Sequence, residues 1–349
     1  MKTILIFFSL MLLVSSSTCH DSKEPTFPAI LVFGDSTVDP GNNNFILTTF
    51  RSNHYPYGRD FPSGTSTGRF SNGKLVPDML ASLFGIKEFI PPYLDPSLSD
   101  DDLRTGVSFA SAGSGFDELT TALSGVIPVA VQVTYFKEYI QRLKMAVGEE
   151  EANKIISGAF VMISAGSNDI IFNFYDTPAR RIEFNISGYH DFLIEKQRSL
   201  VKQLYDLGCR TFALFGLAPL GCVPIQITAK GSHDRKCLEN ENAETQLYNA
   251  KLKNLTRKLP EMLPGSHISF LNTYDAVLDM VKNPQKYGFV ETNRGCCGTG
   301  FLEMGPFCNA FTPVCSNPSE YLFWDGIHPS EATYRLAANT IHEQLTTPK

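Results

Sequence analysis

The segment AILVFGDSTVDPGNNNF, residues 29–45, begins with an apolar run that stops at Gly34-Asp35-Ser36 and continues into a loop rich in glycine and asparagine. A short, continuous apolar run is typical of a strand that is covered on both faces of a parallel sheet. In open α/β sheets, ligands bind beyond the carboxyl ends of the strands. The segment therefore predicts a buried strand that presents the Ser36 hydroxyl at a binding edge.

Four more apolar runs follow, with helical patterns between them. The predicted strands cover residues 29–33, 106–112, 159–165, 211–217 and 267–273. The predicted helices cover residues 73–84, 128–146, 188–207, 239–259 and 330–345. This alternation predicts an α/β fold, a three-layer sandwich with a doubly wound, mainly parallel five-stranded sheet flanked by helices. No linker or repeat divides the sequence, so residues 21–349 are expected to form one domain.

Residues 1–20 predict a cleaved secretory signal peptide. Lys2 precedes the apolar run ILIFFSLMLLV, and the small residues SSST follow it, which is the order typical of such leaders. The run is shorter than the ~20 apolar residues that span a bilayer, and no later segment of the sequence reaches that length. We therefore expect a secreted, extracellular protein without stable membrane insertion.

The net charge and the cysteine content indicate which partners and which cellular compartment to expect. A net charge of -6 and the absence of a basic stripe in the sequence argue against a nucleic-acid partner. Seven of the eight cysteines follow residue 20, and most of them should pair in an oxidising compartment. Cys209, between a helix end and a strand, is expected to stay free as a small buried thiol, and the pairing of the other six stays open. Two acceptor sequons, at Asn185 and Asn254, predict glycosylation.

A serine acts as a nucleophile only beside a base that takes its proton. The best candidate base is His328 in the turn WDGIHP, residues 324–329, where Asp325 lies three positions earlier. At this spacing the carboxylate can hold the imidazole through Nδ1 and leave Nε2 free for Ser36. No zinc site is expected, because the histidines are scattered and the sequence has no C-x-x-C.

Hydrolysis of an acyl group also needs hydrogen-bond donors for the oxyanion. Three donors are predicted at the strand ends: the Ser36 amide, a glycine amide from Gly113 or Gly115, and the side-chain amide of Asn168. Each of these short patterns alone is a common turn. Their joint occurrence at one predicted sheet edge favours catalysis.

A rival nucleophile is Ser66, because residues 64–68 match the pattern G-x-S-x-G. That motif requires a strand before the serine and a helix directly after it. The flanking residues RDFPS and RFSNG are polar and contain a proline, so a loop is the expected structure there.

Four blocks, FGDSTVDPGNNN, FASAGSG, SAGSND and YLFWDGIHPSEA, resemble those of the plant GDSL esterase/lipase family, a branch of the SGNH hydrolases. The resemblance runs from Phe27 to the last helix and implies a secreted serine hydrolase that acts on carboxylic esters without a cofactor or metal. It departs at Ser108, where the family pattern often has asparagine. The residue roles that it implies are Ser36 as nucleophile and oxyanion donor, Gly113 and Asn168 as the other donors, His328 as base and Asp325 as its partner.

Three functions are compatible with these residues. The first is hydrolysis of lipid-like or small acyl esters through an acyl-enzyme intermediate. The second is hydrolysis of acylated cell-wall sugars or secondary metabolites, and the third is a non-catalytic binding protein on the same scaffold. The apolar segment 116–136 can line an acyl site or form a helix packed on the sheet, and Phe172, Phe174 and Tyr175 can border the cleft or belong to the core.

Overall fold

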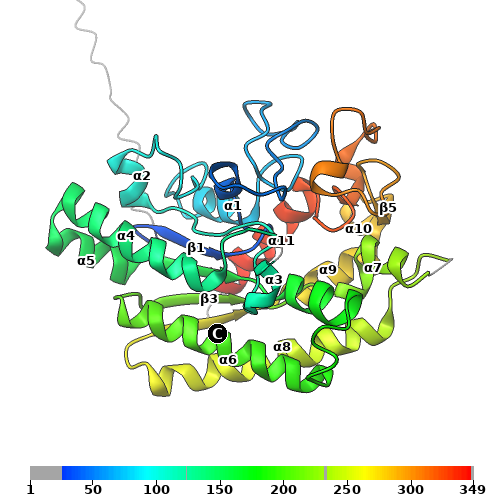
Figure 1. Cartoon of the computed structure of the whole chain (residues 1–349). Helices are drawn as coiled ribbons and strands as arrows, with labels where there is room; N and C mark the ends of the chain where they lie inside the picture. The colour runs from blue at the N-terminus through cyan, green and yellow to red at the C-terminus, as the bar shows by residue number, and fades with distance from the viewer. Residues whose placement is uncertain (1–25, 123, 232–233, 347–349) are drawn as a thin grey trace, which may run out of the picture.

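The computed structural model describes residues 26–122, 124–231 and 234–346. The predicted signal peptide lies outside these residues. A four-stranded parallel sheet occupies the centre in the order β1-β2-β3-β4 (Figure 1). Its strands are β1 (Ile30–Gly34), β2 (Phe160–Ser164), β3 (Thr211–Phe215) and β4 (His267–Leu271).

Helices cover both faces of this sheet (Figure 1). On one face lie α4 (Val129–Val147), α5 (Glu149–Gly158), α6 (Ile186–Asp206) and α8 (Glu239–Met262). On the other lie α1 (Val76–Leu83) and α11 (Glu331–Thr346), with α9 (Thr273–Lys282) against α11. The predicted three-layer α/β fold is confirmed.

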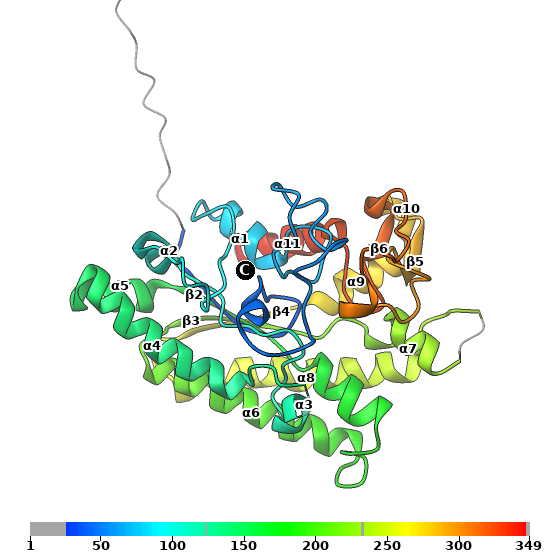
Figure 2. The ribbon, with the colours of Figure 1, turned by 45° about the horizontal axis from the view of Figure 1, so that its top comes forward.

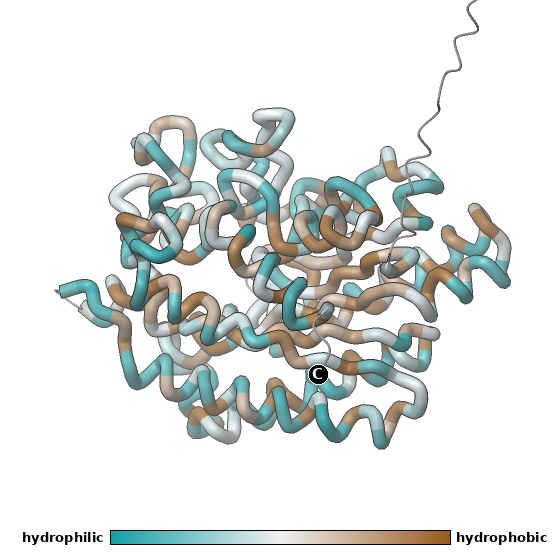
Figure 3. Tube along the Cα trace, turned by 180° about the vertical axis from the view of Figure 1, so that it is seen from behind, coloured by the Kyte–Doolittle hydropathy of each residue, from teal (hydrophilic) through white to brown (hydrophobic). Residues whose placement is uncertain are grey.

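The two faces are set by the period-two alternation of the strands. In β1, Leu31 and Phe33 pack into the core beneath α4 and α6, whereas Ile30 and Val32 pack beneath α1 and α11. Figure 3 shows the same arrangement as hydrophobic strands in the middle and hydrophilic stretches along the outer helices. Because both faces are buried at β1 and β2, the sequences of these two strands are almost continuously apolar, whereas the edge strand β4 is partly exposed.

Shorter elements complete the chain. They are α2 (Asp100–Thr105), α3 (Glu118–Ala122), α7 (Pro224–Ala229), α10 (Pro284–Tyr287), the π-helical segment η2 (Asp169–Asp176), the 3₁₀ turns η1 (Asn42–Phe45), η3 (Leu220–Cys222), η4 (Gly305–Phe307) and η5 (Pro318–Glu320), and the strands β5 (Glu291–Gly295) and β6 (Tyr321–Phe323). The pair β5–β6 lies with α10 at one end of the molecule (Figure 2).

The prediction of a fifth strand at residues 106–112 is wrong. This segment runs beside β1 and forms only an isolated bridge there, between Ser108 and Val32. The next rung is incomplete: the Gly34 carbonyl accepts from the Ser111 amide at 3.1 Å, but the Gly34 amide donates to Gln132 Oε1 at 2.9 Å instead of to this segment. Gln132 Nε2 also donates to the Gly34 carbonyl, at 2.8 Å. A buried side chain from α4 thus occupies the position where a strand carbonyl would accept.

Three disulfides join the six cysteines whose pairing the sequence left open: Cys222–Cys237, Cys296–Cys315 and Cys297–Cys308. Cys209 is free and fully buried, as predicted. Burial raises the pKa of its thiol, so this cysteine stays protonated and unreactive. Within the described ranges, no helix has the length and apolarity that a membrane crossing requires.

We predict that Gln132→Ala lowers the free energy of unfolding by about 1–3 kcal/mol, because it leaves the buried amide of Gly34 without its acceptor. Urea unfolding followed by circular dichroism measures this change. The matched control is Gln141→Ala, at an exposed position of the same helix, for which we expect a change below about 0.5 kcal/mol. Equal effects of the two substitutions would contradict the role given to Gln132.

Candidate active site

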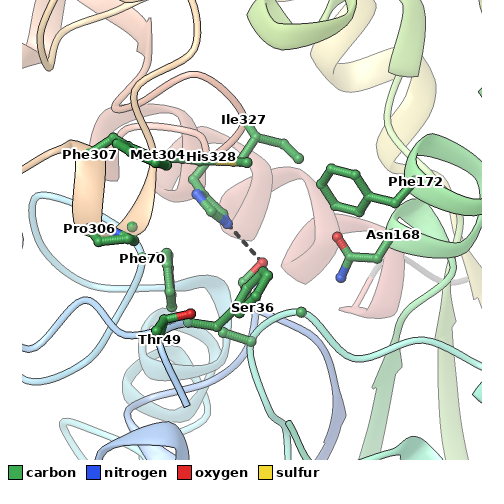
Figure 4. Close-up of a pocket in the computed structure, with 14 residues that line it drawn as sticks. Ser36, Thr49, Phe70, Asn168, Phe172, Met304, Pro306, Phe307, Ile327 and His328 are labelled. Atoms are coloured by element: carbon green, nitrogen blue, oxygen red, sulfur yellow. Dashed lines mark hydrogen bonds between the residues drawn. The ribbon is translucent and has the colours of Figure 1, made fainter. Parts of the chain in front are cut away.

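Ser36 lies at the exit of β1 and forms a hydrogen-bonded chain with His328 and Asp325 (Figure 4). Its Oγ is 2.8 Å from His328 Nε2. His328 Nδ1 in turn lies 2.8 and 2.9 Å from the two carboxylate oxygens of Asp325. An imidazole that donates from Nδ1 leaves Nε2 as the acceptor for the serine proton. The structure thus brings together the three residues predicted as nucleophile, base and partner.

Asp325 is fully buried, and three groups besides His328 Nδ1 donate to its carboxylate. The backbone amides of Ile327 and His328 donate to its Oδ1 at 2.9 and 2.7 Å, and the Tyr57 hydroxyl donates to Oδ2 at 2.7 Å. The Tyr57 oxygen accepts from the Gly305 amide at 2.7 Å. Burial, followed by the nearby Asp325 charge, holds the pKa of Tyr57 well above its usual range, so its hydroxyl keeps the proton that it donates.

Asp35, next to Ser36, takes no part in this chain. Its Oδ1 accepts from the amide and hydroxyl of Thr37 at 3.0 and 2.8 Å. Burial raises the pKa of this carboxyl, and the two Thr37 hydrogen bonds oppose the rise. Asp35 therefore acts locally, in fixing the turn that carries the serine.

Gly113 and Asn168, two of the predicted oxyanion donors, line the same pocket as Ser36. One N–H of the Asn168 side chain donates to the Ser114 carbonyl at 2.8 Å, which orients the amide and leaves its second N–H available. Within the described part of the chain, the backbone amides of Ser36 and Gly113 make no hydrogen bond. Three donors can therefore serve one oxyanion beside Ser36 Oγ.

The structure separates the two glycines between which the sequence could not decide. Gly113 faces the pocket with a φ of +83°. Gly115 packs against the Asp169 carboxylate, and a Cβ there would lie 2.2 Å from Asp169 Oδ1. Asp169 also accepts from the amides of Phe116 and Asp117, and burial raises its pKa to about 7. Close packing against Asp169 therefore requires glycine at position 115, whereas Gly113 is the glycine that lies at the pocket.

The asparagine-rich loop after Ser36 fastens the segment that carries Gly113. Asn42 Nδ2 donates to the carbonyls of Ser108 and Ala110, both at 2.8 Å, and Asn43 Nδ2 donates to that of Ala112 at 3.0 Å. Asp39 accepts from the Ala112 amide at 2.9 Å, and burial raises its pKa to about 6. These buried bonds fix the spacing between Ser36 and Gly113.

This arrangement agrees with the comparisons with known proteins. The family model described as GDSL-like Lipase/Acylhydrolase matches residues 30–341. The chain belongs to the GDSL lipase/acylhydrolase family.

Plant relatives match this GDSL protein over nearly its full length. It is 51% identical to GDSL esterase/lipase At2g31550 of Arabidopsis thaliana, with 97% of this chain and 95% of that one aligned. GDSL esterase/lipase At1g06990 of the same plant is 47% identical, with 98% of each chain aligned. The resemblance found in the sequence is thus confirmed, as is the predicted class of enzyme, a hydrolase that acts on ester bonds.

The GDSL protein departs from the common family pattern at Ser108 without loss of the local turn. Ser108 Oγ donates to the Val38 carbonyl at 3.0 Å and accepts from the Ala110 amide at 3.2 Å. The side chain therefore joins the loop after Ser36 to the segment that leads to Gly113. Within this structure, serine supplies the bonds that hold the two segments together.

The rival nucleophile Ser66 lies in a loop with no strand before it. Its hydroxyl donates to the Tyr57 carbonyl at 2.6 Å, which gives it a structural role. Among the described residues, no group of three or more His, Cys, Asp or Glu side chains is placed to hold a metal ion.

The aromatic residues after Asn168 divide between the pocket and the core. Phe172 lines the pocket. Phe174 stacks on Tyr189 with ring centroids 5.7 Å apart, and the Tyr175 hydroxyl donates to Glu244. The segment 116–136 divides in the same way: α4 packs Val129, Val133 and Phe136 beneath the sheet, whereas Leu119, Thr120 and Ser124 line a second hollow.

Sequence reasoning missed Tyr57 and Gln132. Tyr57 meets Asp325 across 268 positions, and Gln132 meets Gly34 across 98. Neither residue stands in a local pattern that predicts its partner. The asparagines at 42 and 43 were visible as an unusual run, but their acceptors are backbone carbonyls, which any residue carries.

We predict that Tyr57→Phe lowers kcat/KM for ester hydrolysis by roughly tenfold, about 1.4 kcal/mol, while the protein stays folded. The substitution removes the hydroxyl that links Asp325 to the Gly305 amide and keeps the buried ring. Steady-state kinetics and a thermal melt give the two readouts. The matched control is Tyr55→Phe, because Tyr55 lies two residues away and is 55% exposed. Full activity of Tyr57→Phe would show that the Asp325 carboxylate is oriented without this hydroxyl.

Proposed function

We propose that this protein is a secreted hydrolase that cleaves carboxylic esters through Ser36, His328 and Asp325 and a covalent acyl-enzyme intermediate. The observation that supports it best is the unbroken contact series from Ser36 Oγ to His328 Nε2 and from Nδ1 to Asp325. Membership of the GDSL family supplies the ester bond as the target. The same machinery is compatible with an acylated sugar as substrate.

Acylation begins when His328 Nε2 takes the Ser36 proton as Oγ attacks the ester carbonyl. The resulting imidazolium is stabilised by the Asp325 carboxylate. His328 then gives the proton to the leaving alcohol, and the acyl group stays on Ser36. In deacylation a water molecule takes the place of the serine, with His328 again as base, and the carboxylic acid leaves.

The oxyanion of each tetrahedral intermediate accepts hydrogen bonds from the Ser36 amide, the Gly113 amide and Asn168 Nδ2. Such donors act in the transition state because charge develops there, and the loss of one typically costs about 3 kcal/mol. Asn168 is 5% exposed and Ser36 is 7% exposed, so the donors work in a largely dehydrated site, where their electrostatic effect is greater.

Secretion and glycosylation belong to the same proposal. Three disulfides are typical of an oxidising compartment. Asn185 and Asn254 are both exposed. Asn185 caps α6 through its Oδ1, which accepts from the Gly188 amide, so Nδ2 remains available for a glycan. These features agree with export directed by residues 1–20.

The test is hydrolysis of p-nitrophenyl esters by wild type, Ser36→Ala and Ser66→Ala, each produced as the full chain. We expect Ser36→Ala to lower kcat at least about a thousandfold, with an unchanged thermal melt. Ser66→Ala, the matched control, should keep kcat within about threefold of wild type. Loss of turnover in Ser66→Ala alone would refute the assignment of the nucleophile, and a folded wild type without activity on any ester would refute the proposed function.

A further inference from the structure

A buried carboxylate joins the two segments that carry Gly113 and Asn168, two of the proposed oxyanion donors. Asp169 directly follows Asn168, is fully buried and does not line the catalytic pocket. Its Oδ2 accepts from the Phe116 amide at 2.9 Å, and its Oδ1 accepts from the Asp117 amide at 3.0 Å. The carboxylate therefore bonds two successive amides of the segment that carries Gly113.

We propose that Asp169 is a positioning residue of the ester hydrolase, whose carboxylate holds Asn168 and Gly113 at the spacing that one oxyanion requires. The inference rests on the proposed function, because Asp169 acts through two of the proposed donors and does not touch the substrate. Three observations carry it: the place of its hydrogen bonds relative to the donors, the kind of group that these bonds require, and a second carboxylate that makes the same kind of contact.

The hydrogen bonds of Asp169 supply a constraint that Asn168 alone cannot supply. One N–H of the Asn168 side chain donates to the Ser114 carbonyl at 2.8 Å, and the other must stay available for the oxyanion. A single bond leaves the two segments free to turn about it. Asp169 adds two bonds to adjacent amides of the same segment, and two-point contacts of this kind fix orientation as well as distance.

The contacts of Asp169 require a group that accepts at both of its polar atoms. Besides the two amides, the Thr120 hydroxyl donates to Asp169 Oδ1. An ionised carboxylate accepts at both oxygens, whereas an asparagine would present N–H groups to at least one of these donors. Burial raises the pKa of Asp169, and the three hydrogen bonds oppose the rise. The neutral donors thus stabilise the buried charge and set its position together.

A second buried carboxylate makes the same kind of contact on the other side of Gly113. Asp39, three residues after Ser36, accepts at 2.9 Å from the amide that directly precedes Gly113. Asp169, directly after Asn168, accepts from amides that follow Gly113. Each of the outer donors, Ser36 and Asn168, is therefore followed by a carboxylate that bonds the segment of the middle donor. This repetition supports a role in the spacing of the donors.

The charge of Asp169 has an effect opposite to that of its hydrogen bonds. A buried anion near the oxyanion disfavours the negative charge of the tetrahedral intermediate. If this repulsion were the main effect of Asp169, a neutral variant would have a higher kcat. If positioning is the main effect, the same variant has a lower kcat. The direction of the change therefore decides between the two.

The test uses Asp169→Asn, which removes the charge and keeps the size of the side chain, with p-nitrophenyl butyrate as substrate. We expect kcat to fall at least about tenfold, less than the hundredfold or more that follows the outright loss of a donor. KM should stay within about threefold, because the donors act in the transition state. The assay is run at about pH 8.5, above the pKa of about 7 that burial gives Asp169, and a thermal melt reports folding.

The matched control is Asp78→Asn. Asp78 is also a buried carboxylate that accepts from two backbone amides, those of Leu75 and Ile90, but none of the three residues lines the catalytic pocket. We expect this variant to melt at a lower temperature and to keep kcat within about threefold of wild type.

A double-mutant cycle with Asn168→Ala shows whether Asp169 acts through this donor. We expect the loss of kcat from Asp169→Asn to be at least about threefold smaller in the Asn168→Ala background than in the wild-type background. A purely structural role would give the same factor in both backgrounds and would overturn the inference. An unchanged or higher kcat in a folded Asp169→Asn variant would overturn it as well.

If Asp169→Asn does not fold, Thr120→Val gives the same test, because it removes one of the three donors to the carboxylate and keeps the shape of the side chain. We then expect a fall in kcat of about threefold or more at constant KM, and an unchanged kcat would overturn the inference. The proposed function is tested separately by wild type and Ser36→Ala. A wild type inactive on every ester refutes the function, whereas an active wild type matched by Asp169→Asn refutes this inference alone.

Discussion

The active site depends on how the carboxyl end of β1 is fixed at Gly34. Its amide and carbonyl are both bonded by Gln132, and the next amide, of Asp35, donates to the Ser164 carbonyl at 3.0 Å. A Cβ at Gly34 would lie 1.9 Å from that carbonyl oxygen, so only glycine lets β1 approach β2 this closely. Ser36, the proposed nucleophile, follows two residues later. The buried sheet therefore sets the position of Ser36, and the surrounding loops place the other residues of the site around it.

The fixed position of Ser36 explains which parts of the site could be predicted from the sequence. Ser36, Asp325 and His328 were predicted because each stands in a short segment whose local geometry is constrained: a strand end, or a turn just before the last helix. The carboxyl ends of parallel strands meet at one edge, so Asn168 and Gly113 could also be placed near Ser36. The order of elements along the chain was enough to predict these meetings.

The errors and omissions share a physical cause, which is a side chain that reaches a distant backbone group. Residues 106–112 look like a strand because they are apolar and covered, and Val32 does bond Val107 and Phe109. Gln132 takes the place of one backbone acceptor in the ladder at Gly34, and nothing in the segment 106–112 itself signals that competition. Tyr57 is similar: its neighbours in the sequence give no sign that it will meet Asp325. The choice between Gly113 and Gly115 likewise required the position of the Asp169 carboxylate.

The disulfide-bonded segment after β5 contacts the residues that orient His328 and also forms part of the pocket wall. The amides of Cys296 and Cys297 donate to the Phe323 and Trp324 carbonyls at 3.1 and 2.9 Å, directly before Asp325.

Between Cys297 and Cys308, the same segment supplies Gly305, whose amide holds the Tyr57 hydroxyl against Asp325. Met304 and Phe307 on either side of Gly305 line the pocket. A displacement of this segment would therefore move the pocket wall and the support of Asp325 together. The sheet thus fixes Ser36, and this cross-linked segment fixes Asp325 at the other end of the hydrogen-bonded chain that runs through His328.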